Sequence, residues 1–204
     1  MSDTRLSLLV ATTNAGKFAE LRALLSSLPF DLMSLDKIDD LVEVPETGES
    51  FADNARLKAS GYSKQFRIVT VADDSGLEIN ALGGRPGVLS ARYGGPGVDF
   101  DARMRLLLAE MSGARDRAAR FVCAVAVASA QGEIMYQAEG TCNGHIAAKP
   151  RGTHGFGYDP LFVPDGFDLT FGELSANIKQ RISHRSRAFA HIIPFLRGLG
   201  GTLT

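Results

Sequence analysis

The amino-acid sequence predicts an α/β fold, in which helices cover the faces of a mixed β-sheet. The chain opens with an apolar run followed by a helical repeat, and its later part contains several strand-length apolar runs in succession. Its 204 residues suit one large domain, or one domain with two lobes, and we expect residues 1–204 to form a single domain.

A short polar loop separates the first predicted strand from the first predicted helix. Residues 6–11 are the apolar run of a strand that is buried on both faces. Apolar residues then recur every three or four positions from Phe18 to Leu28, which predicts a helix that Thr13 or Asn14 can cap. Backbone N–H groups, the helix dipole and Lys17 favour an anion here, most naturally phosphate. An ordinary capped turn with a solvated lysine is the alternative.

The remaining elements follow from the same periodicities. Helices are predicted over residues 49–64, 99–111 and 184–199, and Pro194 should kink or shorten the last of them. Strands are predicted over residues 67–72, 77–82, 119–129, 133–139 and 142–148.

Composition argues against several classes of protein. The net charge of −1 provides no general basic field for nucleic acid or an anionic membrane, and no apolar stretch approaches 18 residues. The N-terminal sequence lacks the basic start and apolar region of a signal peptide. Cys123 and Cys142 have no C-x-x-C spacing and fit a reducing cytosol, although a bridge between them is possible. We therefore expect a cytoplasmic protein without a nucleic-acid or membrane partner.

An acidic pair follows the predicted strand at residues 67–72. Asp73 and Asp74 are adjacent, so their carboxylates repel each other, and burying either without compensation is costly. A divalent cation would relieve this, and carboxylate oxygens are ligands that Mg²⁺ prefers. The alternative is a solvated turn in which the two side chains cap backbone amides.

A glycine-rich loop at residues 152–166 contains aromatic and acidic groups. Phe156 and Tyr158 could stack on a flat ligand, and Asp159 could accept hydrogen bonds from the edge of a base. Both aromatic rings could instead anchor the loop in the core.

A basic stretch at residues 177–189 begins the last predicted helix. Ser183 has the character of an N-cap, which places His184 and Arg185 in the first helical turn. The helix dipole disfavours cations there, and a local rule broken in this way is a hint of function. A solvated basic face is the alternative. Together the four stretches provide the groups needed to bind a nucleotide with Mg²⁺.

In this order and spacing, the four stretches resemble the inosine triphosphate pyrophosphatase family. The resemblance spans almost the whole chain. The matching motifs are T-x-N-x-x-K then E-L at 12–21, E-T-G at 46–48, N-A-x-x-K-A at 54–59, A-D-D-S-G-L at 72–77, L-G-G-x-P-G-x-x-S-A-R-Y at 82–93, G-F-G-Y-D-P-x-F at 155–162 and I-S-H-R at 182–185.

The resemblance implies an elongated mixed β-sheet flanked by helices, and two lobes with a central nucleotide-binding cleft, usually in a homodimer. It implies Mg²⁺-dependent attack of water on the α-phosphorus of deaminated purine nucleoside triphosphates (dITP, ITP, XTP and dXTP), which releases pyrophosphate. Asp74 would bind Mg²⁺ and act on the water, and Glu46 would be a second carboxylate near the metal. The implied substrate-binding residues are Thr12, Thr13, Asn14, Ala15, Gly16, Lys17, Ser75, Phe156, Gly157, Tyr158, Asp159, Lys179, His184 and Arg185.

The resemblance also assigns roles within that set. The loop from Thr12 to Lys17 would hold the triphosphate, and Phe156 would stack on the base whose edge Asp159, His184 and Arg185 read. Two other functions compete with this one. A Maf-type pyrophosphatase would act on other modified nucleotides, and a nucleotide-binding module without catalysis would use its acidic pair only structurally.

Overall fold

The computed structural model describes residues 5–38 and 41–201, which form two compact units. Unit 1 comprises Met1–Asp74, Cys123–Gly140 and Ser186–Thr204, and unit 2 comprises Ser75–Val122 and Thr141–Arg185. Each unit buries a hydrophobic core of its own.

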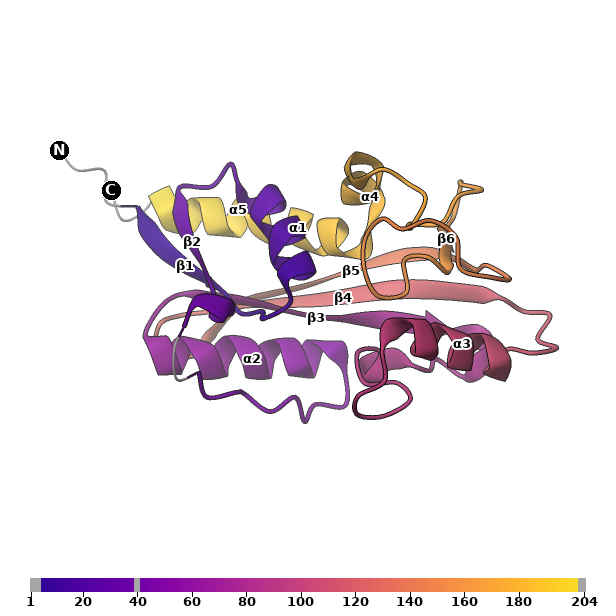
Figure 1. The fold of residues 1–204 in the computed structure, drawn as a ribbon. Helices are drawn as coiled ribbons and strands as arrows, with labels where there is room; N and C mark the ends of the chain where they lie inside the picture. The colour runs from indigo at the N-terminus through magenta and orange to yellow at the C-terminus, as the bar shows by residue number, and fades with distance from the viewer. Residues whose placement is uncertain (1–4, 39–40, 202–204) are drawn as a thin grey trace. The chain divides into compact units, whose positions relative to one another are not determined.

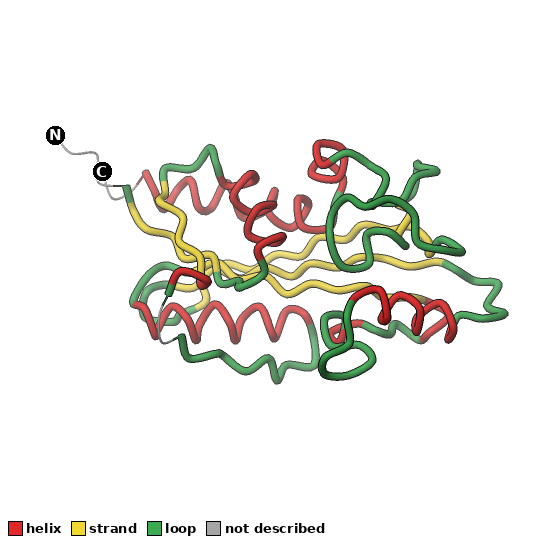
Figure 2. The backbone as a smooth tube through the Cα atoms, in the orientation of Figure 1, coloured by secondary structure: helices red, strands yellow, loops and turns green. Residues whose placement is uncertain are grey.

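Six strands form a sheet in the order β2-β1-β3-β4-β5-β6. Strand β1 pairs in parallel with β2 and β3, whereas β5 and β6 are antiparallel, with Ile146 opposite Phe162. This mixed sheet with helices around it confirms the predicted α/β class (Figure 2). The strands are β1 (Leu6–Val10), β2 (Phe30–Ser34), β3 (Thr70–Ile79), β4 (Ala118–Ala128), β5 (Ile134–Ile146) and β6 (Phe162–Pro164).

Helices cover both faces of the strands in unit 1. Helix α1 (Ala15–Leu25) and the unit 1 part of α5 (His184–Gly201) lie on one face, and α2 (Phe51–Phe66) lies on the other (Figure 1). Leu21 of α1 and Phe189 of α5 pack with Val71 and Val125 of the strands, and each is at most 1% exposed. Full burial of such a side chain contributes about 1.5–3 kcal/mol, so this core fixes α1 beside the end of β1.

The core of unit 2 is rich in aromatic residues. Phe121, Phe162 and Phe171 have ring centroids 4.7–6.1 Å apart. Met104 and Leu107 of α3 (Phe100–Glu110) belong to the same core. Unit 2 also contains α4 (Ala176–Ile182) and the short 3₁₀ helices Asn80–Leu82 and Gly87–Leu89, and unit 1 contains a third at Leu35–Lys37.

Most of the long predicted elements are confirmed. The helices expected at 49–64, 99–111 and 184–199 are α2, α3 and α5, and the strand expected at 119–129 is β4. Helix α5 continues past Pro194, so the prediction that this proline shortens it is wrong. The short elements β2, β6 and α4 were not predicted, since such segments give little periodicity, although the equally short β1 was found from its apolar run.

Two pairs of predicted strands are each a single strand. Strand β3 covers parts of the predicted strands at 67–72 and 77–82, and β5 covers parts of those at 133–139 and 142–148 (Figure 2). Asp73 and Asp74 were expected to follow the end of a strand, but both lie in the interior of β3, and this also excludes the alternative of a solvated turn. Lysine side chains from two helices compensate the buried carboxylates, so the backbone can stay extended.

Two further sequence expectations are tested by the fold. Cys123 and Cys142 are both buried free thiols, so the possible bridge between them is absent. Within residues 5–38 and 41–201, no helix has the length and hydrophobicity needed to cross a membrane.

Candidate active site

The loop between β1 and α1 is held by two of its own side chains. Thr12 Oγ1 accepts a hydrogen bond from the backbone N–H of Asn14 at 3.2 Å, and Asn14 Oδ1 accepts one from the backbone N–H of Lys17 at 2.9 Å. Asn14 is thus the N-cap of α1, and Thr13 is not. By helix geometry, the N–H groups of Ala15 and Gly16 have no partner within α1. The loop therefore has the open donors that an anion needs.

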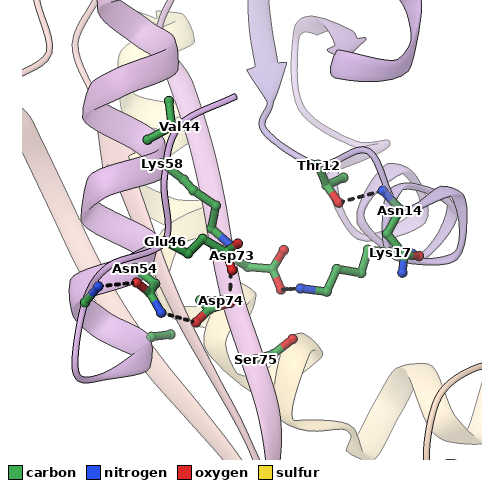
Figure 3. A network of polar contacts seen from close by, with 12 residues as sticks. Thr12, Asn14, Lys17, Val44, Glu46, Asn54, Lys58, Asp73, Asp74 and Ser75 are labelled. Carbon is green, nitrogen blue, oxygen red and sulfur yellow. Dashed lines mark hydrogen bonds and ion pairs between the residues drawn. The ribbon is translucent and has the colours of Figure 1, made fainter. Parts of the chain in front are cut away.

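Lys17 connects this loop to the acidic pair. Its Nζ lies 3.3 Å from Oδ2 of Asp73, whose side chain is 1% exposed, whereas that of Lys17 is 17% exposed (Figure 3). The Cys123 thiol lies 3.9 Å from the same oxygen. Asp73 therefore faces the side of the sheet that α1 covers, and its charge balances that of Lys17.

Asp74 contacts α2 on the opposite face. Its Oδ1 lies 3.2 Å from Nζ of Lys58, and its Oδ2 accepts a hydrogen bond from Nδ2 of Asn54 at 3.1 Å. Lys58 Nζ also lies 2.9 Å from Oε1 of Glu46, so one ammonium group joins two carboxylates (Figure 3). Successive side chains of a strand point to opposite faces, which explains how Asp73 and Asp74 can be adjacent and have different partners.

Asn54 also holds the segment that carries Glu46. Its Oδ1 accepts a hydrogen bond from the backbone N–H of Gly48 at 2.8 Å. A side chain at Gly48 would collide with α2, since its Cβ would lie 2.5 Å from Cβ of Asp53. The E-T-G motif thus brings Glu46 close to α2.

Burial and charge act in opposite directions on this group. Burial raises the pKa of Asp74, and the positive charges of Lys58 and Lys17 oppose that rise. Burial by itself would lower the pKa of Lys58, but the carboxylates of Asp74, Asp73 and Glu46 outweigh it, so the pKa of Lys58 is raised. Lys58 therefore remains a cation at neutral pH.

The donors of this group suit Mg²⁺, although they form no complete metal site by themselves. Among the described residues, no three His, Cys, Asp or Glu side chains are grouped so that they could hold a metal ion. Mg²⁺ in phosphate-handling enzymes is commonly bound by one or two carboxylates, with substrate phosphates and water as the other ligands. Asp74 and Glu46 converge on one cation, the Lys58 ammonium, so they fit that incomplete type of site.

A second group of predicted residues lies in unit 2. Arg185 is 1% exposed, and its Nη2 donates a hydrogen bond to Oγ of Ser75 at 2.9 Å. The His184 ring stacks on Phe121 with a centroid separation of 4.7 Å and an interplanar angle of 13°. Ser183 is the C-cap of α4, and with its extended backbone it also directly precedes the first residue of α5, which is the N-cap position predicted for it. The structure therefore holds His184 and Arg185 in the core, so these two residues do not belong to a solvated basic face, whereas Arg181 and Arg187 are exposed.

Asp159 organises the glycine-rich loop. Its Oδ2 lies 2.6 Å from Nζ of Lys179 and accepts a hydrogen bond from the backbone N–H of Phe156 at 2.8 Å. Lys179 Nζ lies 4.7 Å from the centroid of the Phe156 ring, and the Arg185 guanidinium lies 5.7 Å from it. Gly155 has a φ of +74°, and a Cβ there would lie 2.0 Å from Oδ2 of Asp159, so only glycine fits.

The two aromatic residues of this loop have different surroundings. Phe156 is partly exposed, whereas Tyr158 is 3% exposed and donates a hydrogen bond to the carbonyl oxygen of Ser90 at 3.0 Å. Burial raises the pKa of Tyr158, so its hydroxyl stays protonated. Gly157 lies beside Phe100, whose ring meets that of Tyr158 edge to face. Tyr158 thus anchors the loop, and Phe156 is the ring that a ligand could reach.

Asn54 and Lys58 were not predicted as site residues, although both belong to the N-A-x-x-K-A motif. Both are on the buried face of α2, at 1% and 8% exposure, beside apolar Phe51, Ala55 and Tyr62. Polar side chains on the apolar face of an amphipathic helix need partners, and that position was the signal that could have identified them.

Comparisons with known proteins agree with this geometry. The Ham1 family model matches residues 8–195. This chain belongs to the Ham1 family. A Ham1 protein from Coxiella burnetii has a solved structure that superposes with a TM-score of 0.86 at 34% identity, covering 95% of this chain and 99% of that one.

Curated relatives of this Ham1 chain carry the name of an enzyme. The dITP/XTP pyrophosphatase of Nostoc is 46% identical over 187 residues, which are 92% of both chains. The dITP/XTP pyrophosphatase of Mycobacterium tuberculosis is 48% identical over 197 residues, or 94% of this chain and 96% of that one. These comparisons confirm the family that the sequence motifs suggested.

Proposed function

We propose that this chain hydrolyses deaminated purine nucleoside triphosphates (dITP, ITP, XTP and dXTP) to the nucleoside monophosphate and pyrophosphate, and so removes them from the nucleotide pool. One observation carries the proposal: in a Ham1 chain whose relatives are named dITP/XTP pyrophosphatases, Asp74 is buried, hydrogen-bonded on both oxygens and flanked by cations. That is the environment in which a carboxylate can act on water beside a polyphosphate.

In this proposal, the unit 1 group handles the triphosphate. The Thr12–Lys17 loop binds phosphate oxygens through its N–H groups and Lys17, and Asp74 orients the attacking water and accepts its proton. Asn54 and Lys58 hold the Asp74 carboxylate in one orientation. Asp74 and Glu46 would hold Mg²⁺, which supplies positive charge for the phosphate oxygens when it is bound.

The unit 2 group handles the base. Phe156 provides the stacking surface, and Asp159 and Lys179 fix its loop. His184 and Arg185 provide hydrogen-bond donors for the oxygen at C6 of hypoxanthine or xanthine. Ser75 orients the Arg185 guanidinium. We further propose that the protein works in the cytoplasm as a homodimer.

A panel of substrates tests the function. We expect Mg²⁺-dependent pyrophosphate release from ITP, dITP and XTP and very little from ATP, measured with the purified protein under identical conditions. Preferential turnover of modified pyrimidine nucleotides would favour a Maf-type pyrophosphatase instead. Binding without turnover of any member of the panel would identify a nucleotide-binding module and refute the proposal.

Replacing Lys17 tests the phosphate loop. We expect Lys17→Ala to reduce kcat/KM for ITP about ten- to hundredfold, since a charge-assisted contact is worth roughly 1.5–3 kcal/mol. Both KM and kcat should change, because the contact exists in ground and transition states alike. Arg22→Ala, in the last turn of the same helix, is the control. If neither kinetic constant changes in the folded variant, Lys17 is a solvated lysine in a capped turn.

The pH dependence of the reaction tests the role of Asp74. Its pKa is raised by burial, and the base must be ionised, so kcat/KM should fall on acidification at a pH above the ordinary aspartate value of 3.8. Lys58→Met removes a positive charge that opposes the rise in the pKa of Asp74, so kcat/KM should begin to fall at a still higher pH. Lys64→Met on the same helix should leave the pH of this fall unchanged. A fall that moves to lower pH in Lys58→Met would contradict the assignment.

A further inference from the structure

A cavity in unit 2 has no role in the proposed reaction. It has a volume of about 440 Å³ and is formed where β5 ends, beside β6 and the residue that precedes β4. None of its lining residues belongs to the candidate active site. They are Arg117, His145, Ile146, Ala147, Ala148, Lys149, Arg151, Val163 and Asp168.

Positive charge is concentrated in this cavity. Arg117, Lys149 and Arg151 line it, against the single carboxylate of Asp168. In the part of the chain that the structure describes, Arg117 and Lys149 form no ion pair, and Arg151 pairs with Glu173 at 3.3 Å. The whole chain has a net charge of −1, so this excess of positive charge is local. Such a cavity favours an anion.

Backbone contacts hold the two guanidinium groups in place. Arg117 donates from Nε to the carbonyl oxygen of Ile146 at 2.6 Å and from Nη2 to that of Ala147 at 2.8 Å. Arg151 donates from Nη2 to the carbonyl oxygen of Asp168 at 2.9 Å. Carbonyl oxygens do not neutralise the charge of Arg117, whereas Glu173 offsets that of Arg151, and each guanidinium has five N–H donors, which is more than these contacts use. A fixed, planar guanidinium suits phosphate oxygens.

The wall and the rim of the cavity differ in character. Ile146 and Val163 are 0% and 2% exposed and belong to adjacent paired strands, so this wall is rigid. Lys149 and His145 are exposed at the opening and can approach a ligand without disturbing the core. A rigid wall with an exposed lysine beside it is suited to a small anion.

We propose that this cavity binds a small phosphate-bearing anion at a site separate from the candidate active site. The shared chemistry is a phosphate or pyrophosphate group, which could come from free pyrophosphate or from a free nucleotide.

Calorimetric titration of the full chain tests this inference, with inorganic pyrophosphate and ATP as separate probes in the presence of a chelator. The Lys17→Ala background weakens binding at the active-site loop, so that the second site dominates the signal. In that background, we expect Lys149→Glu to weaken binding at least about tenfold, as loss of a charge-assisted contact predicts. Arg115→Glu is the matched control, because Arg115 is exposed nearby, carries the same charge and does not line the cavity.

The two probes identify the source of the anion, since the one that binds more tightly and responds more strongly to Lys149→Glu is the closer mimic. Unchanged binding in Lys149→Glu would overturn the proposal. Equal weakening in Arg115→Glu would also overturn it, by showing a general charge effect. A single-stranded DNA 12-mer that loses binding in Lys149→Glu, while pyrophosphate binding does not change, would show a nucleic-acid surface instead.

Discussion

The Asp74→Asn variant is expected to lose at least about a hundredfold of its turnover of inosine triphosphate, which is the usual size of a general-base effect. Asparagine keeps the shape of the side chain and its hydrogen bond with Asn54, but it loses the charge and the basicity. It also presents an amide to the Lys58 ammonium in place of a carboxylate.

Asp31→Asn is the matched control, because it makes the same chemical change at an exposed position of β2, away from the site. Thermal unfolding of both variants separates lost catalysis from lost folding. Near-normal turnover of Asp74→Asn at saturating Mg²⁺ would remove Asp74 from the catalytic role.

Selectivity against ATP is expected to be very large and to depend on Arg185. Hypoxanthine and xanthine carry an oxygen acceptor at C6, whereas adenine carries an amino donor, and arginine can only donate. Adenine would thus bring donor against donor and leave buried groups unpaired. Sites built in this way discriminate by about 10⁴–10⁵. The Arg185 guanidinium, which is 1% exposed and fixed by Ser75, has little freedom to rearrange for the wrong base.

We expect Arg185→Ala to lower kcat/KM for inosine triphosphate far more than for ATP. The ratio of the two kcat/KM values should therefore fall. Arg181→Ala is the control, since Arg181 is an exposed arginine of α4. Because Arg185 is buried, its replacement can also destabilise the fold. Thermal unfolding of Arg185→Ala, and the more conservative Arg185→Lys, separate lost folding from lost selectivity. An equal fractional loss on both substrates would show that Arg185 serves phosphate binding or folding.

Local signals in the sequence predicted the strand, loop and helix at the start of the chain well. The spacing of apolar residues located α1, and its polar start narrowed the cap to Thr13 or Asn14, of which the structure uses Asn14. These features depend on residues within a few positions of one another, which is the range over which sequence patterns are informative.

Features that depend on distant partners were predicted less well. The acidic pair was placed after the end of a strand, with a divalent cation or a solvated turn as the two ways to compensate it, because its actual partners, Lys17 and Lys58, are distant in the chain. The contacts of Asp159 Oδ2 with Lys179 and the Phe156 backbone were likewise not predicted, whereas the proposed contact of Asp159 with the base edge stays a prediction. Burial and partner choice are tertiary properties that no local pattern contains.

The placement of Asp73 and Asp74 on opposite faces of β3 has a consequence for how this family can vary. Strand alternation has a period of two, so inserting or deleting one residue between the β1-paired segment and Asp73 would exchange the faces of both carboxylates. Each carboxylate would then meet the wrong lysine and a different core. Length variation should therefore be tolerated in surface loops and excluded from this stretch of strand. A deep insertion scan with abundance and activity as readouts would map that boundary to a single residue.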